Sequence, residues 1–126
     1  LQAMASGKRI RLVTDQIGIP CYAGVLAPAL LRCAEGGPAG LFQLACGGEA
    51  SAYDWISAGA RAAGIPLLAE RISREGLGGA YRPQRSCLSS ERFRKAWGVR
   101  LPHWRDALAL AMEENPPSVW LRAGGP

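Results

Sequence analysis

Apolar and polar residues alternate with the two-residue period of a β-strand in Ile10-Arg11-Leu12-Val13-Thr14, a stretch rich in β-forming residues. Two further short apolar segments, residues 40–45 and 67–72, are also predicted to be strands. The pattern therefore predicts three strands, separated by longer segments with a different period.

Those longer segments have the period of amphipathic helices. Residues 22–35 place one apolar stripe on a helix, formed by Val25, Leu26, Ala29, Leu30 and Cys33. Pro28 falls inside this helix and is expected to kink it or to displace its start. A second helix is predicted to begin at Ser51, because Ser51 and Asp54 have the spacing of a helix cap, and to end at Gly64. Its inward face is expected to contain Ala52, Trp55, Ile56, Gly59 and Ala63.

The last third of the chain is predicted to hold two short helices, at residues 89–97 and 103–114. The order of strands and helices predicts an α/β fold with mixed α+β character. Residues 73–84, with three glycines and one proline, form the longest irregular stretch and the expected functional loop. We expect one domain over residues 1–115 and a flexible tail over residues 116–126.

The composition is that of a folded globular protein: 126 residues, 48% hydrophobic and 20% charged. No apolar run approaches the roughly 20 residues that cross a bilayer, so we expect no membrane partner. The four cysteines form no C-x-x-C pair and there is one histidine, so the spacing of a zinc site is missing. Their even number would permit disulfides, but reduced thiols and a cytoplasmic location fit the sequence better.

Arginine accounts for most of the positive charge. The formal net charge is +5, with thirteen arginines against two lysines, Lys8 and Lys95. The planar guanidinium fork suits phosphate, so an anionic partner is favoured. Nucleic acid and a diphosphate-linked sugar both meet this condition.

Three motifs follow one another in the chain: residues 15–20 after the first strand, residues 82–88 (RPQRSCL) and residues 98–105 (GVRLPHWR). With Gly47-Gly48-Glu49-Ala50-Ser51, they resemble the C-terminal part of the dTDP-4-dehydrorhamnose reductase family, which belongs to the extended short-chain dehydrogenases. The resemblance covers residues 7–114. It implies the substrate-binding C-terminal portion of that fold, without its Rossmann cofactor half.

The sequence lacks the features that bind the cofactor and transfer the proton in such a reductase. No glycine-rich turn joins a strand to a helix, and no tyrosine is followed by lysine four residues later. We therefore expect no catalytic residue and no bound cofactor in this chain, which would be inactive alone. The resemblance implies NADPH or NADH as the cofactor of the parent enzyme and an N-terminal cofactor domain as a partner. Removal of that domain would leave an apolar face, so a homo-oligomer is also possible.

Four residues are the predicted substrate contacts. Arg82, Arg85 and Ser86 could place several donors on one diphosphate, although a solvated basic loop would give the same pattern. Gln16, at the end of the first strand, could reach a sugar hydroxyl or ring oxygen. The alternative for this loop is a turn formed by the Asp15 side chain. The resembled family often has asparagine where Arg85 stands.

Other conspicuous residues are assigned structural roles. Trp55 and Trp104 are expected in the core, and His103 at the surface or at a helix start. Glu114 matches a glutamate through which some relatives bridge subunits with magnesium, but Gly24 replaces the second ligand. We therefore expect no metal site.

The parent enzyme implied by the resemblance reduces the 4-keto group of dTDP-6-deoxy-L-lyxo-4-hexulose to dTDP-L-rhamnose, and this chain would supply part of the pocket for the nucleotide sugar. Two alternatives come from other classes. One is a fragment of a non-catalytic regulatory subunit of the methionine adenosyltransferase β type. The other is an arginine-rich nucleic-acid-binding module, which lacks the interleaved aromatic residues that such modules use.

Overall fold

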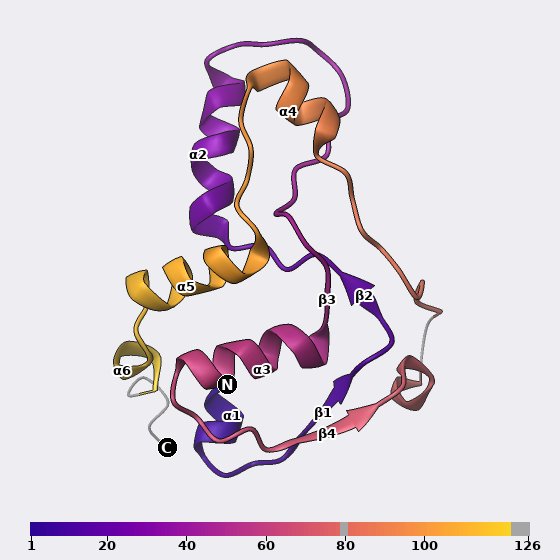
Figure 1. Cartoon of the computed structure of the whole chain (residues 1–126), viewed down its shortest axis with the longest axis vertical. Coiled ribbons are helices and arrows are strands. Elements are labelled where there is room, and N and C mark those ends of the chain that lie inside the picture. Colours follow the sequence, from indigo (N-terminus) through magenta and orange to yellow (C-terminus); the bar gives the residue numbers. More distant parts are fainter. Residues whose placement is uncertain (79–80, 122–126) are drawn as a thin grey trace.

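A computed structural model describes residues 1–78 and 81–121 of the chain. Figure 1 shows helices gathered at both ends of an elongated molecule, with two small sheets in one half. In chain order the elements are α1 (Gln2–Ala5), β1 (Ile10–Val13), β2 (Ile17–Gly18), α2 (Ala23–Ala34), β3 (Ala50–Ser51), α3 (Ala52–Ala62), β4 (Ala69–Ile72), the 3₁₀ helix η1 (Arg74–Leu77), α4 (Glu91–Trp97), α5 (Trp104–Glu114) and α6 (Pro117–Trp120).

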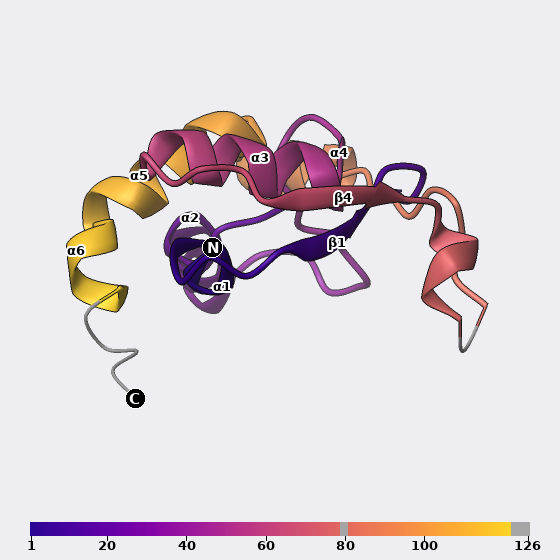
Figure 2. The ribbon, with the colours of Figure 1, turned by 90° about the horizontal axis from the view of Figure 1, so that it is seen from below.

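The longer sheet consists of β1 and β4, which run parallel with Ile10 opposite Ala69 and Val13 opposite Ile72. Helix α3 lies along one face of this pair (Figure 2). Parallel strands need a crossover between them, and α3 is the second of the two helices in that connection, after α2. The mixed α/β character predicted from the sequence is therefore confirmed.

The second sheet is small but orders the loop after β1. Strand β2 pairs antiparallel with β3, Ile17 opposite Ser51. On the other side of β2, the Ile17 N–H donates to the Gln84 carbonyl at 2.7 Å and the Ser86 N–H donates to the Ile17 carbonyl at 2.9 Å. Residues 84–86, which are far from β2 in sequence, thus run alongside β2 on the side opposite β3.

The predicted start of the second long helix is confirmed. The Ser51 hydroxyl accepts a hydrogen bond from the Asp54 N–H at 3.1 Å, and the Asp54 carboxylate accepts from the Ser51 N–H at 2.9 Å. This reciprocal pair satisfies N–H groups that the first turn leaves unpaired. The helix ends at Ala62 with Ala63 as its C-cap, and Gly64 follows with φ +66°, a conformation that favours glycine.

Two buried clusters stabilise the fold. One contains Cys46, Ala50, Trp104 and Ala107 and joins β3 to α5. The other contains Met4, Ala60 and Ile65 and joins α1 to α3. Trp104 is 3% exposed, so its predicted place in the core is confirmed.

The prediction of a strand at residues 40–45 is wrong. This segment has no strand partner in the described part of the chain, because side chains from the region of α4 satisfy its main chain instead. Ser90 Oγ accepts from the Ala45 N–H at 2.7 Å and donates to the Ala45 carbonyl at 3.0 Å, and Arg92 donates to the Leu41 carbonyl at 3.0 Å. The other predicted elements are present with shifts of a few residues, and α2 runs through Pro28.

The expected loop at residues 73–84 begins with η1, and its residues 79–80 lie outside the described part of the chain. Helix α6 occupies residues 117–120 of the predicted tail, and Leu121 packs against the cluster that contains Met4. Residues 122–126 are also outside the description. None of the described helices is both long and apolar enough to span a membrane.

Candidate functional site

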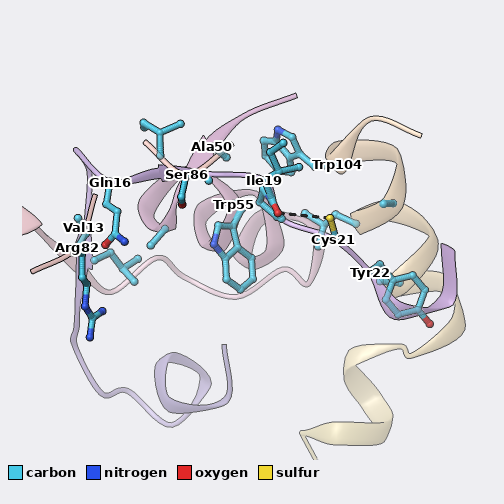
Figure 3. Close-up of a pocket in the computed structure, with 18 of the residues that line it drawn as sticks. Val13, Gln16, Ile19, Cys21, Tyr22, Ala50, Trp55, Arg82, Ser86 and Trp104 are labelled. Atoms are coloured by element: carbon cyan, nitrogen blue, oxygen red, sulfur yellow. Dashed lines mark hydrogen bonds between the residues drawn. The ribbon is translucent and has the colours of Figure 1, made fainter. Parts of the chain in front are cut away.

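A cavity of about 690 Å³ opens between the two sheets, α3 and α5 (Figure 3). Its volume lies in the range of sites that hold drug-sized ligands. It is lined by β1, the loop that carries β2, β3, the first turn of α3, residues 82 and 86, and one face of α5. No aspartate, glutamate or histidine is among the described lining residues. The positive charges of the lining residues Arg11 and Arg82 would therefore favour an anionic ligand.

Three of the four predicted contact residues, Gln16, Arg82 and Ser86, line this cavity. Gln16 directly precedes β2, and Ser86 is held beside β2 by its own N–H. None of the three side chains hydrogen-bonds to any residue in the described part of the chain. One guanidinium, one amide and one hydroxyl are thus available to a ligand.

Arg85 lies elsewhere. Its guanidinium forms a two-pronged ion pair with Glu49, with Nε donating to Oε2 at 3.1 Å and Nη2 donating to Oε1. Arg85 lines a second cavity, of about 740 Å³, and not the first. The hydrogen bonds from Arg85 hold the pKa of the Glu49 carboxyl below its usual value. The structure therefore separates Arg85 from the other three predicted contacts.

Trp55 lies at the cavity, and its predicted place in the core is wrong. Its side chain is 41% exposed, and in Figure 3 the indole projects between Gln16 and Arg82 at one end and Tyr22 at the other. Gly59 and Ala60 are the buried residues of α3, which leaves Trp55 at the edge of the buried stripe. Helical periodicity alone could not show that Trp55 is exposed, because the apolar stripe of α3 is broad and includes residues at its edge.

Tyr22 closes the far end of the cavity. Its hydroxyl donates to Glu114 Oε2 at 2.5 Å and accepts from Asn115 Nδ2 at 3.0 Å. The hydrogen bond to Glu114 raises the pKa of Tyr22. The carboxylate that the resemblance linked to a metal is therefore engaged in joining α5 to the start of α2.

Asp15 does not form the turn considered from the sequence. Its Oδ1 accepts the N–H of Arg74 at 2.7 Å and so attaches η1 to the end of β1. Arg11, on β1, also lines the cavity and donates to the Gly76 carbonyl at 3.2 Å. Arg11 is a second cation of the site that the sequence reasoning missed, because a single exposed arginine on a strand carries no distinctive signal.

The N-terminus of α3 differs from the helix start of a dinucleotide site. In a cofactor domain, a glycine-rich turn presents free N–H groups to the pyrophosphate. The N-terminus of α3 is the one that directly follows a strand in the described chain, and the Asp54 carboxylate already accepts from its cap and would repel an anion. The described residues also contain no cluster of three or more His, Cys, Asp or Glu side chains that could hold a metal ion.

A family model described as the RmlD substrate binding domain matches residues 1–116. The chain belongs to this family. The match spans the sheets and the cavity with its lining residues Gln16, Arg82 and Ser86, so the candidate site lies within the matched region.

Curated relatives of this RmlD-family chain agree with the match. It is 35% identical over 120 residues to a dTDP-4-dehydrorhamnose reductase of Mycolicibacterium smegmatis, which covers 89% of the chain and 36% of the relative. It is 30% identical over 116 residues to the spore coat polysaccharide biosynthesis protein SpsK of Bacillus subtilis, covering 91% and 40%. The chain thus spans about two fifths of the length of these relatives.

Solved structures show the same fold. The dTDP-4-dehydrorhamnose reductase of Bacillus anthracis, solved in complex with NADP, superposes with a TM-score of 0.81 at 21% identity, over 89% of this chain and 41% of that one. The corresponding protein of Clostridium acetobutylicum gives 0.75 at 24% identity, over 87% and 40%. The RmlD-family fold is therefore retained at low sequence identity.

Proposed function

We propose that this chain is the substrate-binding part of a dTDP-4-dehydrorhamnose reductase and that the cavity of about 690 Å³ holds the nucleotide sugar. The observation that carries the proposal is the convergence of Arg82, Ser86 and Gln16, all unpaired within the described chain, on a cavity without acidic lining residues. Membership of the RmlD family supports it.

Each side chain has a role in this proposal. The Arg82 guanidinium binds the diphosphate, since a planar cation matches phosphate oxygens. The Ser86 hydroxyl and the Gln16 amide hydrogen-bond to the phosphate and the sugar. Trp55 offers an exposed aromatic face on which a base or a sugar ring can pack.

The chemical step takes place with groups from outside this chain. A cofactor domain would bring NADPH or NADH, which supplies the hydride that reduces the 4-keto group of dTDP-6-deoxy-L-lyxo-4-hexulose to give dTDP-L-rhamnose. The residues described here bind and orient the sugar nucleotide and hold no proton donor for that step. The capped N-terminus of α3 and the coverage of about two fifths of the relatives support this division of labour.

Residues 1–115 form the substrate-binding unit in this proposal. The four cysteines are free thiols, which supports a reducing, cytoplasmic location. Leu30, Leu31 and Leu41 are exposed, and the cofactor domain or a second copy of the chain would cover apolar surface of this kind. Neither a regulatory subunit nor a nucleic-acid-binding module is favoured by the similar proteins found.

A titration of dTDP into wild-type chain and into Arg82→Ala tests the proposed role of Arg82. Loss of the charge-assisted contact should cost about 1.5 kcal/mol, or roughly tenfold in affinity, the lower end of the range because Arg82 is exposed. Arg82→Lys should recover only part of this loss, since it restores the charge without the fork.

Arg61→Ala is the matched control, because Arg61 is exposed on α3 and does not line the cavity. It should leave the affinity for dTDP unchanged. Equal affinities in Arg82→Ala and wild type, with both proteins folded, would contradict the proposed contact.

A further inference from the structure

Residues 81–86 carry two of the proposed ligand contacts on an exposed segment. Its hydrogen bonds to the main chain of other segments, in the described part of the chain, are the two with Ile17 described above. A segment held by so few contacts would lose conformational freedom on binding, and that loss would weaken the affinity. Side chains that hold it in place before binding would therefore strengthen binding without touching the ligand.

The Arg85–Glu49 ion pair has the geometry for this task. Glu49 directly precedes β3, whereas Arg85 lies opposite Ile17 on the far side of β2. The pair thus crosses the small sheet and fastens the segment to β3, whose Ala50 and Ser51 are both buried. Because both carboxylate oxygens accept from the guanidinium, the contact fixes direction as well as distance.

The other end of the segment is held by Arg74. Its Nη1 donates to the Arg82 carbonyl at 2.9 Å, and its own N–H donates to Asp15 at the end of β1. The residue that bears the ligand-binding guanidinium is therefore connected through Arg74 to the longer sheet.

We propose that Arg85 and Arg74 are positioning residues, which hold residues 82–86 so that Arg82 and Ser86 face the cavity. This inference rests on the proposed function, since it assigns to the two arginines the ordering of the segment that contacts the diphosphate. Glu49 and Asp15 anchor them. Arg85 thereby acts through its neighbours in the segment and makes no contact with the ligand itself.

Glu49→Gln tests the proposal by removing the ion pair while keeping the size of the side chain. Its side chain is 41% exposed and that of Arg85 63%, so a modest effect is expected, about two- to fivefold weaker binding of dTDP. Exchanging the charges, Glu49→Arg with Arg85→Glu, should restore most of the affinity. Arg74→Ala should weaken binding in the same direction.

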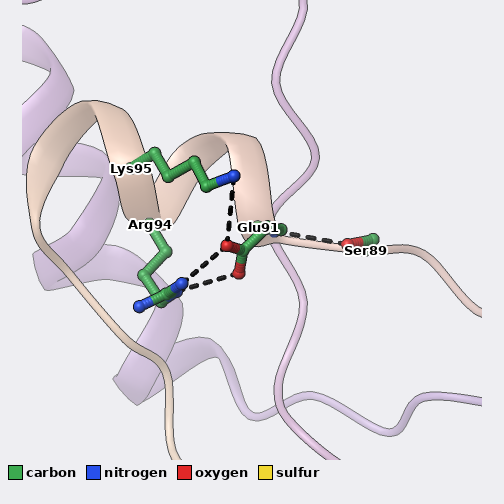
Figure 4. A network of polar contacts seen from close by, with 4 residues as sticks. All are labelled: Ser89, Glu91, Arg94 and Lys95. Atoms are coloured by element: carbon green, nitrogen blue, oxygen red, sulfur yellow. Dashed lines mark hydrogen bonds and ion pairs between the residues drawn. The ribbon is translucent and has the colours of Figure 1, made fainter.

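The matched control is Glu91→Gln, which breaks a similar two-pronged pair with Arg94 (Figure 4). Glu91 and Arg94 are comparably exposed and do not line the proposed substrate cavity. This variant should bind dTDP like wild type. A loss equal to that of Glu49→Gln would show a general effect of surface charge and overturn the proposal.

A double-mutant comparison separates positioning from a structural role. In an Arg82→Ala background, Glu49→Gln should weaken dTDP binding clearly less than it does in wild type, because the group it positions is gone. An unchanged loss there, or no loss in wild type while Arg82→Ala does weaken binding, would overturn the positioning role and leave the proposed function intact. Failure of wild-type chain to bind dTDP would contradict the proposed function itself.

Discussion

Arg82 and Arg85 stand three positions apart in one motif, yet they have different surroundings. Arg82 lines the cavity and Arg85 pairs with Glu49, which lies 36 positions earlier in the chain. The motif predicts both arginines as substrate contacts, because no neighbouring residue in the sequence indicates which of them has a partner within the protein. Gln16, Arg82 and Ser86 lie at one cavity, as their selection as one group implied, whereas the separation of Arg85 depends on a long-range contact.

Trp55 and Trp104 also differ in their surroundings, since Trp104 is buried and Trp55 is exposed at the cavity. Trp104→Ala should destabilise the fold by about 3–5 kcal/mol, because its side chain is buried in the cluster with Cys46 and Ala107. Trp55→Ala should cost less stability, since Trp55 is 41% exposed, but should weaken dTDP binding. Urea unfolding and dTDP titration of the two variants measure both effects.

The outcome that contradicts this account is a reversed pattern. If Trp55→Ala lost as much stability as Trp104→Ala, or if it bound dTDP as tightly as wild type, the proposed contact between Trp55 and the ligand would be contradicted.

At the scale of elements, those specified by local signals were predictable. The start of α3 is an example, since Ser51 and Asp54 form the predicted cap. The small sheet was not predictable, because β2 and β3 have two residues each and are paired by contacts between distant segments. The prediction of a strand at residues 40–45 was wrong for the opposite reason. Its local pattern fits a strand, but its backbone groups hydrogen-bond to side chains of distant residues.

The cap of α3 should contribute to stability in a pH-dependent way. Hydrogen bonds from the Ser51 hydroxyl and the Ser51 N–H lower the pKa of Asp54 in the folded state. The charged carboxylate therefore stabilises the fold above the ordinary aspartate pKa of about 3.9, and this contribution is lost as the pH falls through the lowered value. Ser51→Ala should cost about 1 kcal/mol near neutral pH.

Urea unfolding of wild type and Asp54→Asn at pH 7 and near pH 3 measures this contribution. The stability difference between the two proteins should be largest at pH 7 and should shrink at low pH. A difference independent of pH would show that the charge of Asp54 does not contribute through the cap.

At the scale of the whole molecule, the proposed function assigns the substrate to the cavity of this chain and the cofactor to a separate domain. The α/β class and most helices follow from periodicity, and the resemblance to RmlD-family proteins follows from the motifs. The placement of the cavity does not follow from either, because it is formed by β1, α3, α5 and residue 82, which meet only in the folded chain. The proposed function therefore depends on a division in which this chain binds the substrate and a separate domain binds the cofactor.

Isothermal titration of the wild-type chain with dTDP and, separately, with NADPH tests this division. We expect saturable heat with dTDP, because the diphosphate meets Arg82 and Ser86, and none with NADPH, because the sequence has no glycine-rich turn joining a strand to a helix to receive its pyrophosphate. Saturable binding of NADPH at the same site, or the absence of binding by dTDP to folded chain, would contradict it.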